Sequence, residues 1–190
     1  KSGKKMIIKE VKTTAKKTFA PGLYDLTELQ RDANKRFGYS AKETLNIMQR
    51  LYESHKVLTY PRTDSRYITT DVADTLKERL KACSVGPYRK LAGSLSMRPI
   101  RKNASFVDNK KVTDHHAIIP TEQFVDLQTM TNEERKVYDL VVRRFLAVLL
   151  PAFEYDQTVF TGGLAGESFT AKGKIVKSQG WKEAYENLET

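Results

Sequence analysis

The chain has 190 residues, with 33 Lys and Arg against 23 Asp and Glu, a net charge of +10 and 39% hydrophobic residues. At about 150 residues per domain, this length corresponds to one domain or two small ones. The single cysteine excludes a disulfide framework, the lack of a Cys/His cluster excludes structural zinc, and no apolar run approaches the roughly 18 residues of a membrane span. The sequence begins without an initiator Met and ends in mid-pattern, so we expect a piece of a larger soluble protein.

Positive charge gathers in two blocks. Residues 1–20 hold seven Lys against one acid, and residues 81–111 hold eight Lys and Arg against one acid. Blocks of this kind are typical of phosphate-binding surfaces, although a solvated lysine-rich tail explains the first block equally well. Within the first block, residues 6–14 read as a β-strand. The second block favours an ordered or binding-ordered loop because it contains three apolar anchors, Tyr88, Met97 and Phe106.

Three capping-box patterns predict helix starts. Each places an N-cap side chain three residues before a Glu, so that two orphan main-chain amides are satisfied reciprocally. The patterns are Asp25-Leu-Thr-Glu28, Ser40-Ala-Lys-Glu43 and Thr131-Asn-Glu-Glu134. Apolar residues at helical spacing follow each start, and the same spacing predicts a fourth helix after Thr70 that carries Val72, Leu76 and Leu80.

The first two helices form a pair joined by a tight turn at Gly38, and β-like residues 57–60 follow them. This order resembles a helix-turn-helix with a wing-like strand. Most helix pairs in soluble proteins are only packing units, so the pattern acquires meaning from the arginine-rich segment that follows it.

The C-terminal part of the chain predicts β structure. Residues 157–176 indicate a β-hairpin with Gly162-Gly163 as its turn. Both ends of the chain therefore look β and the middle looks helical, with Pro21 and Pro151 at the crossings. The predicted fold class is α+β, with a helical domain of winged-helix-like character, residues 21–150, inserted into a β part formed by residues 1–20 and 151–190.

The segment 58–67 is dense in phosphate-binding and reactive groups. Pro61 biases Tyr60 towards an extended conformation, and in an extended run Tyr60, Arg62 and Asp64 share one face. A tyrosine hydroxyl has a reference pKa of about 10, so attack on a phosphodiester needs a nearby cation or proton acceptor. Arg62 could supply that cation. The alternative is a packed tyrosine beside a surface salt bridge between Arg62 and Asp64.

A second reactive segment covers residues 113–121. His115 beside Asp114 is a candidate phosphate hydrogen-bond donor or proton shuttle. Adjacent histidines point in different directions on a regular element, so His115 and His116 are not expected to share a metal. The alternative is a histidine whose hydrogen bonds serve only the packing of the protein.

Three segments of the sequence together resemble type IA DNA topoisomerases, and most closely the bacterial topoisomerase III branch. They are Tyr24-Asp-Leu-Thr-Glu-Leu-Gln-Arg-Asp-Ala, Leu58-Thr-Tyr-Pro-Arg-Thr-Asp-Ser-Arg and Asp114-His-His-Ala-Ile-Ile-Pro-Thr. Residues 169–173 and 180–185 are similar to the family's return into its β arch domain, so the resemblance covers essentially the whole chain. It makes residues 1–20 and 151–190 part of that arch and residues 21–150 the tyrosine-bearing domain.

The resemblance implies a role for each candidate residue. Tyr60 is expected to attack a single-stranded DNA phosphate, giving a 5′-phosphotyrosine and a free 3′-hydroxyl without ATP. Arg62 is expected to position the phosphate, His115 to support cleavage and Asp64 to assist. Contacts with DNA are expected from Arg66, His116 and Lys56.

The resemblance also implies what this chain lacks. The family binds Mg²⁺ in an amino-terminal Toprim domain through a glutamate and an Asp-x-Asp-x-Glu cluster, and this chain contains no Asp-x-Asp. We expect no cofactor or metal in the chain itself. The expected partners are single-stranded DNA and the Toprim and remaining domains of the same polypeptide. We expect a cytoplasmic, nucleoid-associated monomer with no membrane partner. Its isolated form is expected to bind single strands weakly without cleaving them, and its gate is expected to hinge near Pro21 and Pro151.

Other readings of the tyrosine fit less well or leave residues unexplained. Tyrosine recombinases place a His-x-x-Arg before the tyrosine, and relaxases use His-apolar-His for a metal, whereas this chain has adjacent histidines after the tyrosine. A non-catalytic winged-helix module, with Tyr60 stacking on a base and Arg62 holding a phosphate, explains the basic blocks. It leaves the Asp114-His-His sequence unexplained.

Overall fold

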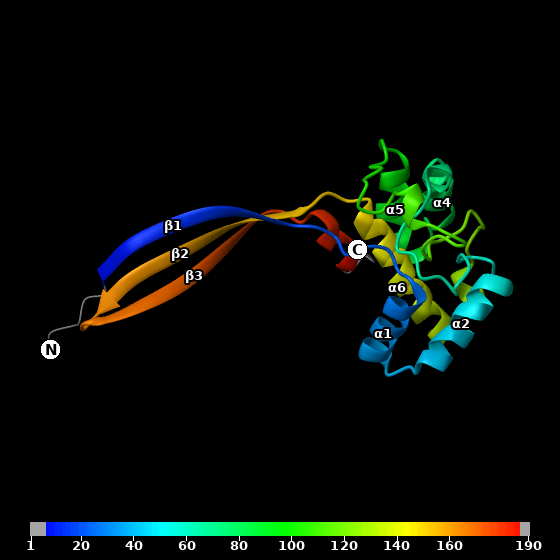
Figure 1. Ribbon diagram of the computed structural model, residues 1–190, viewed down its shortest axis with the longest axis horizontal. Helices are drawn as coiled ribbons and strands as arrows, with labels where there is room; N and C mark the ends of the chain where they lie inside the picture. Colours follow the sequence, from blue (N-terminus) through cyan, green and yellow to red (C-terminus); the bar gives the residue numbers. More distant parts are fainter. Residues whose placement is uncertain (1–6, 187–190) are drawn as a thin grey trace.

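The computed structural model describes residues 7–186 and consists of a long three-stranded sheet that projects from a helical body (Figure 1). The sheet contains β1 (Ile7–Thr18), β2 (Phe153–Leu164) and β3 (Glu167–Ser178), antiparallel in the order β1-β2-β3. All the α-helices come from the sequence between β1 and β2. This combination of helices with a small antiparallel sheet confirms the predicted α+β class. The assignment of the two parts to separate domains of a larger protein stays a prediction.

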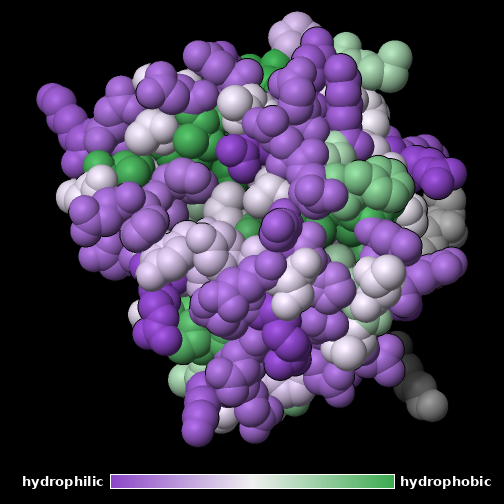
Figure 2. Space-filling model, turned by 90° about the vertical axis from the view of Figure 1, so that its right-hand side faces the viewer, coloured by the Kyte–Doolittle hydropathy of each residue, from purple (hydrophilic) through white to green (hydrophobic). Residues whose placement is uncertain are grey.

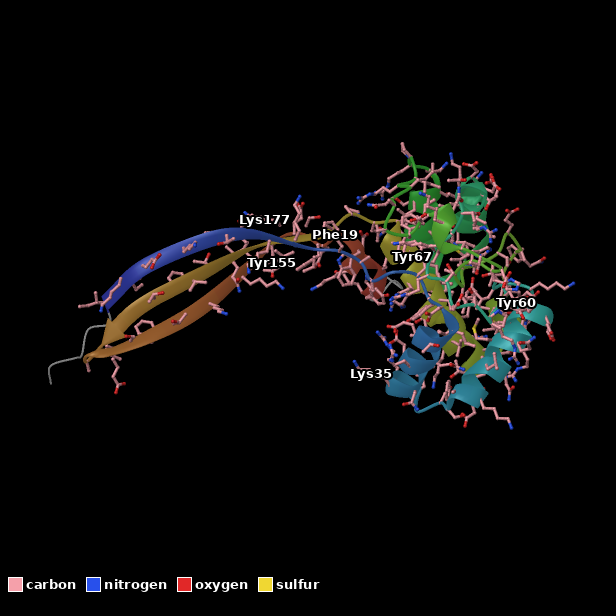
Figure 3. All side chains as sticks on the ribbon, in the orientation of Figure 1. Phe19, Lys35, Tyr60, Tyr67, Tyr155 and Lys177 are labelled. Atoms are coloured by element: carbon pink, nitrogen blue, oxygen red, sulfur yellow. The ribbon has the colours of Figure 1, made fainter. Side chains whose placement is uncertain are left out.

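The sheet is open to solvent. Every residue of β1 is exposed, and apolar side chains of the sheet such as Ile8, Val11 and Ile175 are 51%, 56% and 61% exposed. In Figure 3, Tyr155 and Lys177 lie on the sheet and Phe19 lies where it approaches the body. A sheet without a buried face is held by its hydrogen-bond ladders and its cross-strand side-chain pairs.

The turn between β2 and β3 lies at Ala165 and Gly166, so the predicted turn at Gly162-Gly163 is wrong. Ala165 and Gly166 have φ of 53° and 83°, the left-handed values that favour a two-residue hairpin turn. Gly162 instead lies inside β2 opposite Phe169. A Cβ added to Gly162 would lie 2.7 Å from the Phe169 ring and 2.5 Å from the carbonyl oxygen of Ile7. Cross-strand packing, not a turn, therefore requires glycine at this position.

Three helices begin where the capping patterns predict. They are α1 (Leu26–Phe37), α2 (Ala41–Glu53) and α6 (Asn132–Val148), and each N-cap side chain accepts a hydrogen bond from the amide three residues later. Within the described residues, a reciprocal capping box forms only between Thr131 and Glu134. The Glu28 carboxylate instead pairs with Arg31 and Arg144. Gly38 ends α1 in the left-handed conformation, with φ of 73°, as expected.

Two predicted elements of the helical body differ in the structure. The single helix expected after Thr70 is divided into α3 (Thr70–Ala73) and α4 (Leu76–Ala82). The Thr75 hydroxyl donates to the carbonyl oxygen of Val72 at 2.7 Å, a local bond of the kind that competes with helix continuation. The strand expected at residues 57–60 is also wrong, because this segment makes only one antiparallel bridge, between Leu58 and Pro120. No wing therefore follows the helix pair in the described chain.

The basic segment 81–111 is ordered. It contains the short 3₁₀ helix η1 (Gly86–Tyr88), the helix α5 (Arg89–Ser96) and a second 3₁₀ turn, η2 (Asn109–Lys111). Tyr88 and Phe106 are buried as expected of anchors, whereas Met97 is 86% exposed at the end of α5 and anchors nothing. Two further 3₁₀ elements are η3 (Leu127–Thr129) and η4 (Gly180–Tyr185).

The core of the body surrounds α6, whose buried side chains include Val137, Tyr138, Val141 and Phe145. The helices α1 and α2 and the element η4 pack against α6, and α4 packs against α5 (Figure 1). Among the described residues, no helix is both long and apolar enough to cross a bilayer.

Arg144, on the buried side of α6, ties the body to the chain that enters it from β1. Its Nε donates to the carbonyl oxygen of Gly22 at 2.6 Å, and its Nη1 lies 3.3 Å from Asp32 Oδ2. Its guanidinium carbon lies 4.4 Å from the centre of the Tyr24 ring. Burial, together with the hydrogen bond to Asp32, raises the pKa of Tyr24 far above its ordinary value. No pattern in the sequence indicates this cluster.

Candidate active site

Two loops that are distant in the sequence lie side by side in the helical body. Residues 57–67 run along residues 117–121, and four main-chain hydrogen bonds or bridge contacts join them. The Thr59 amide donates to the carbonyl oxygen of Ile119 at 3.0 Å, and the Ala117 amide donates to that of Tyr67 at 2.9 Å. The structure therefore brings the two reactive segments of the sequence together.

The rings of Tyr60 and His115 are stacked. Their centroids are 4.0 Å apart and their planes differ by 25°. Tyr52, near the end of α2, forms a T-shaped pair with Tyr60, with ring centroids 5.5 Å apart and ring planes at 85°. His115 is exposed and Tyr60 is half-buried, so the aromatic group lies at the protein surface. Figure 3 shows Tyr60 at the end of the body that is far from the sheet.

Two threonine hydroxyls fasten the loops on either side of Tyr60. The Thr59 hydroxyl donates to the carbonyl oxygen of Ala117 at 3.3 Å and accepts from the Ile119 amide at 2.9 Å. The Thr63 hydroxyl donates to the carbonyl oxygen of His115 at 3.1 Å and accepts from the Ser65 amide at 3.1 Å. Thr59 and Thr63 are not among the site residues predicted from the sequence. Their positions directly flanking Tyr60-Pro61-Arg62 are the feature of the sequence that could indicate them.

The Ser65 hydroxyl extends this fastening to the basic segment. It donates to the carbonyl oxygen of Lys111 at 2.8 Å. Thr63 and Ser65 are 7% and 6% exposed, so these hydrogen bonds are shielded from water.

Arg62 and Asp64 line a different cavity from Tyr60. Their side chains are exposed around a cavity of about 420 Å³ that His115 and Asp114 also line, beside the start of α1. The Thr63 amide donates to the carbonyl oxygen of Pro61 at 3.0 Å, which turns the chain at Arg62. The expectation that Tyr60, Arg62 and Asp64 alternate on one extended face is therefore wrong, and His115 connects the tyrosine to the other two.

The surface salt bridge offered as the alternative explanation does not form. Among the described residues, neither Arg62 nor Asp64 belongs to an ion pair within 4.0 Å. The guanidinium of Arg62 is thus available to a ligand in the cavity.

The three residues expected to contact DNA lie in three places. Lys56 lines the cavity beside Tyr60. His116 lies close to the ring stack in sequence, but its Nδ1 bonds to the carbonyl oxygen of Ala117 at 2.7 Å, and burial lowers the pKa of its imidazole. Arg66 donates to the carbonyl oxygen of Leu23 at 3.1 Å and lines a third cavity, nearer the sheet, with Phe19 and Arg101. Their contacts with DNA stay predictions.

The residues present do not fit a metal ion on their own. Asp64 and Asp114 line one cavity, but between residues 7 and 186 no group of three His, Cys, Asp or Glu side chains could hold a metal. Divalent cations such as Mg²⁺ need a larger set of oxygen ligands from the protein, the substrate and water. No step of the chemistry below is therefore assigned to a metal held by this chain.

The surface around this end of the body is mostly hydrophilic. Figure 2, which views the molecule from the end opposite the sheet, shows apolar side chains only in small separate patches. Such a surface suits a polar, charged ligand better than an extensive apolar protein interface.

The chain matches known proteins over nearly its whole length. A family model described as DNA topoisomerase matches residues 1–190. The chain is 65% identical over 178 residues to a protein of Bacillus cereus named DNA topoisomerase 3, covering 94% of this chain and 24% of that protein. It is 56% identical over 187 residues to the protein of the same name from Bacillus subtilis, covering 98% of this chain and 26% of that protein.

A solved structure shares the fold. Full-length topoisomerase I from Thermotoga maritima superposes with a TM-score of 0.69 at 24% sequence identity, over 97% of this chain and 30% of that chain. The chain therefore spans about a quarter of the length of the curated relatives it matches.

Proposed function

The chain belongs to the DNA topoisomerase family, and from this premise we propose that it carries the nucleophile that cleaves and rejoins one strand of DNA within a longer polypeptide. The observation that carries the proposal is the stack of Tyr60 on His115, together with the cavity that His115 shares with Arg62. This arrangement presents a hydroxyl, an imidazole and an exposed guanidinium to one ligand.

The proposed reaction is a transesterification. The Tyr60 hydroxyl oxygen attacks the phosphorus of a single-stranded DNA phosphodiester and loses its proton. A bond forms between phosphorus and Tyr60, the bond to the 3′-oxygen breaks, and that oxygen takes up a proton to become a 3′-hydroxyl. One phosphodiester replaces another, so rejoining reverses the same steps without ATP. The guanidinium of Arg62 stabilises the charge that develops on the phosphate oxygens.

The stacked geometry suggests what His115 does. An imidazole nitrogen donates or accepts hydrogen bonds in the plane of its ring, and this plane is within 25° of parallel to the Tyr60 ring. A nearly parallel ring does not direct its nitrogens at the tyrosine hydroxyl. We assign His115 to donating a hydrogen bond to the phosphate, and leave the proton of Tyr60 to a group outside this chain or to water.

The finer features of the proposal rest on the family resemblance. They are a single-stranded substrate, a 5′-phosphotyrosine intermediate, Mg²⁺ held by a Toprim domain elsewhere in the polypeptide, and action as a cytoplasmic, nucleoid-associated monomer. Asp64, exposed in the cavity with Arg62, is proposed to assist, and Arg66, His116 and Lys56 are proposed to contact the strand.

The test is adduct formation by the whole polypeptide on a labelled single-stranded oligonucleotide with Mg²⁺. We expect a protein-linked 5′ end with the native protein and none with Tyr60→Phe, because phenylalanine keeps the ring but lacks the attacking oxygen. Tyr52→Phe is the matched control, since it removes a neighbouring hydroxyl and should leave the adduct in place. Adduct formation by Tyr60→Phe would show that the nucleophile is another residue.

The non-catalytic alternative has one observation in its favour, the run of three packed rings Tyr52, Tyr60 and His115. Aromatic rings that stack on bases bind single strands without chemistry. That reading predicts unchanged oligonucleotide binding in Tyr60→Phe and no adduct from the native polypeptide. The adduct assay therefore separates the two functions.

A further inference from the structure

A second cavity lies beside Tyr60 and shares no described lining residue with the cavity of Arg62. Its volume is about 590 Å³, enough for a nucleotide, and it is formed where α2 ends. The side chains around it include Tyr52, Glu53, Lys56, Leu58, Tyr60 and Thr121. Tyr60 lines this cavity and His115 lines the other, so the stacked pair stands between them.

The two cavities differ in chemistry. The cavity with Arg62 is bordered by the Arg62 guanidinium and the His115 imidazole, which can bind a phosphate, and by the carboxylates of Asp64 and Asp114, which can accept a hydrogen bond from a hydroxyl. The cavity beside Tyr60 offers the partly exposed ring of Tyr52, whereas the side chain of Leu58 is buried in the core. Glu53, the acid at the cavity edge, accepts a hydrogen bond from Gln49 at 2.7 Å, and no arginine of the described chain lines this cavity to clamp a phosphate. This second cavity therefore suits a nucleobase.

Lys56, at the edge of the same cavity, has an unusual backbone. Its φ is 58°, in the left-handed region where glycine is far more favourable than lysine. Two hydrogen bonds hold this conformation. The Thr121 hydroxyl donates to the carbonyl oxygen of Lys56 at 2.7 Å, and the Val57 amide donates to the carbonyl oxygen of Leu51 at 3.0 Å. Strained positions of this kind gather at functional sites, and here the lysine side chain gives a reason to keep the strain.

Resting on the proposed function, we infer that this cavity holds the base of the nucleotide that Tyr60 retains through its 5′ phosphate. The phosphate lies at the Tyr60 hydroxyl, the base packs against the ring of Tyr52, and the Lys56 ammonium neutralises the next phosphate along the strand. The nucleotide that leaves with the 3′-hydroxyl lies on the side of Arg62. The aromatic contact makes the cavity tolerant of base identity, because every base has a stacking face.

Equilibrium binding to this chain tests the inference without cleavage. The probe is a 5′-phosphorylated octanucleotide whose first base is 2-aminopurine, a fluorophore quenched by stacking, and a matched octanucleotide lacks that base. We expect Tyr52→Ala to weaken binding of the complete probe roughly 5- to 150-fold and to remove the quenching. The same substitution should leave the affinity for the abasic probe unchanged. Tyr52→Phe keeps the ring and should behave as the native chain.

Lys56→Gly tests the phosphate contact without disturbing the fold. Glycine accepts the left-handed backbone, so the unfolding midpoint should stay the same or rise. The slope of log affinity against log salt concentration should become less negative by about 0.7, the value for one phosphate contact on a single strand. An unchanged slope would remove Lys56 from the site.

Three results would overturn the base site. In the first, Tyr52→Ala weakens binding of the complete and abasic probes equally. In the second, the quenching of 2-aminopurine survives that substitution. In the third, quenching occurs only when 2-aminopurine is placed at the 3′-hydroxyl end of a separate oligonucleotide. Binding needs no attack by Tyr60, so these results leave the proposed nucleophile untouched. Failure of adduct formation by the native whole polypeptide, in turn, leaves the binding result standing.

Discussion

The hydroxyl of Thr63 donates a hydrogen bond to the main-chain carbonyl oxygen of His115 at 3.1 Å, although the two residues are 52 positions apart in the sequence. The same hydroxyl accepts from the Ser65 amide, and Thr63 is 7% exposed. This hydroxyl therefore links the loop that bears Tyr60 to the loop that bears the ring stacked on it.

Replacing Thr63 by Val should destabilise the protein. The isosteric change removes both hydrogen bonds of the hydroxyl and leaves the buried Ser65 amide and the part-buried His115 carbonyl oxygen without this partner, which costs about 1–3 kcal/mol. Urea unfolding of the chain measures this loss. Thr63→Ser should restore most of it. Thr158→Val is the control, because its hydroxyl bonds to Thr13 in an exposed part of the sheet and should change stability by less than about 0.5 kcal/mol.

Arg144 should be among the residues to which stability is most sensitive. Its side chain is 7% exposed and lies between Asp32, Glu28 and the Tyr24 ring. Arg144→Met leaves the two half-buried carboxylates and the buried Tyr24 ring without their cation, and the loss should approach the lower end of the roughly 3–5 kcal/mol for breaking a buried pair. Arg31→Met is the matched control, because Arg31 also pairs with Glu28 but is 68% exposed, and surface pairs contribute at most about 1 kcal/mol. Urea unfolding measures both losses. Equal losses in the two variants would contradict the stabilising role of Arg144.

Local features of this fold could be predicted from the sequence, and long-range ones could not. The N-caps Asp25, Ser40 and Thr131 were found because an N-cap acts on an amide three residues away. The pairing of Thr59 with Ala117 joins residues 58 apart, and no periodicity of either segment indicates it. Only the family resemblance, and no pattern within the two reactive segments, indicates that they share one site.

The wrong expectations have the same origin. An alternating pattern placed Tyr60 and Arg62 on one face because it assumed an extended chain, and the turn between Pro61 and Thr63 is visible only in the structure. A helical apolar stripe gives no reason to bury a cation, and Asp32 is 112 residues from Arg144, so the sequence does not indicate this pair.

The glycine pair in β2 offers a direct test of cross-strand packing. Gly162→Ala would place its Cβ 2.5 Å from the carbonyl oxygen of Ile7 and 2.7 Å from the Phe169 ring. Overpacking of this kind costs about 1–3 kcal/mol. Gly163→Ala meets nothing closer than 3.4 Å, from the flexible side chain of Lys9, and should be neutral or slightly stabilising in a strand. Hydrogen exchange of the β2 amides measures the difference. Equal protection in the two variants would show that the sheet relaxes around residue 162.

The burial of His116 should make stability depend on pH. Burial lowers the pKa of its imidazole, and this effect outweighs the opposing one of the hydrogen bond to Ala117. The unfolded chain therefore binds a proton more readily than the folded chain. The contribution to stability is complete above the unfolded pKa of about 6.5 and is lost as the pH falls through the lower pKa of the folded state.

His116→Asn should reduce this pH dependence. Asparagine does not titrate, and its Nδ2 can donate to the Ala117 carbonyl oxygen in place of Nδ1. Urea unfolding at about pH 7.5 and about pH 5.5 should show a smaller loss for the variant than for the native chain, by up to about 1 kcal/mol. The matched control is His115→Asn, whose side chain is exposed in the neighbouring position. A loss that is the same in His116→Asn as in the native chain would show that burial of this imidazole is not its cause.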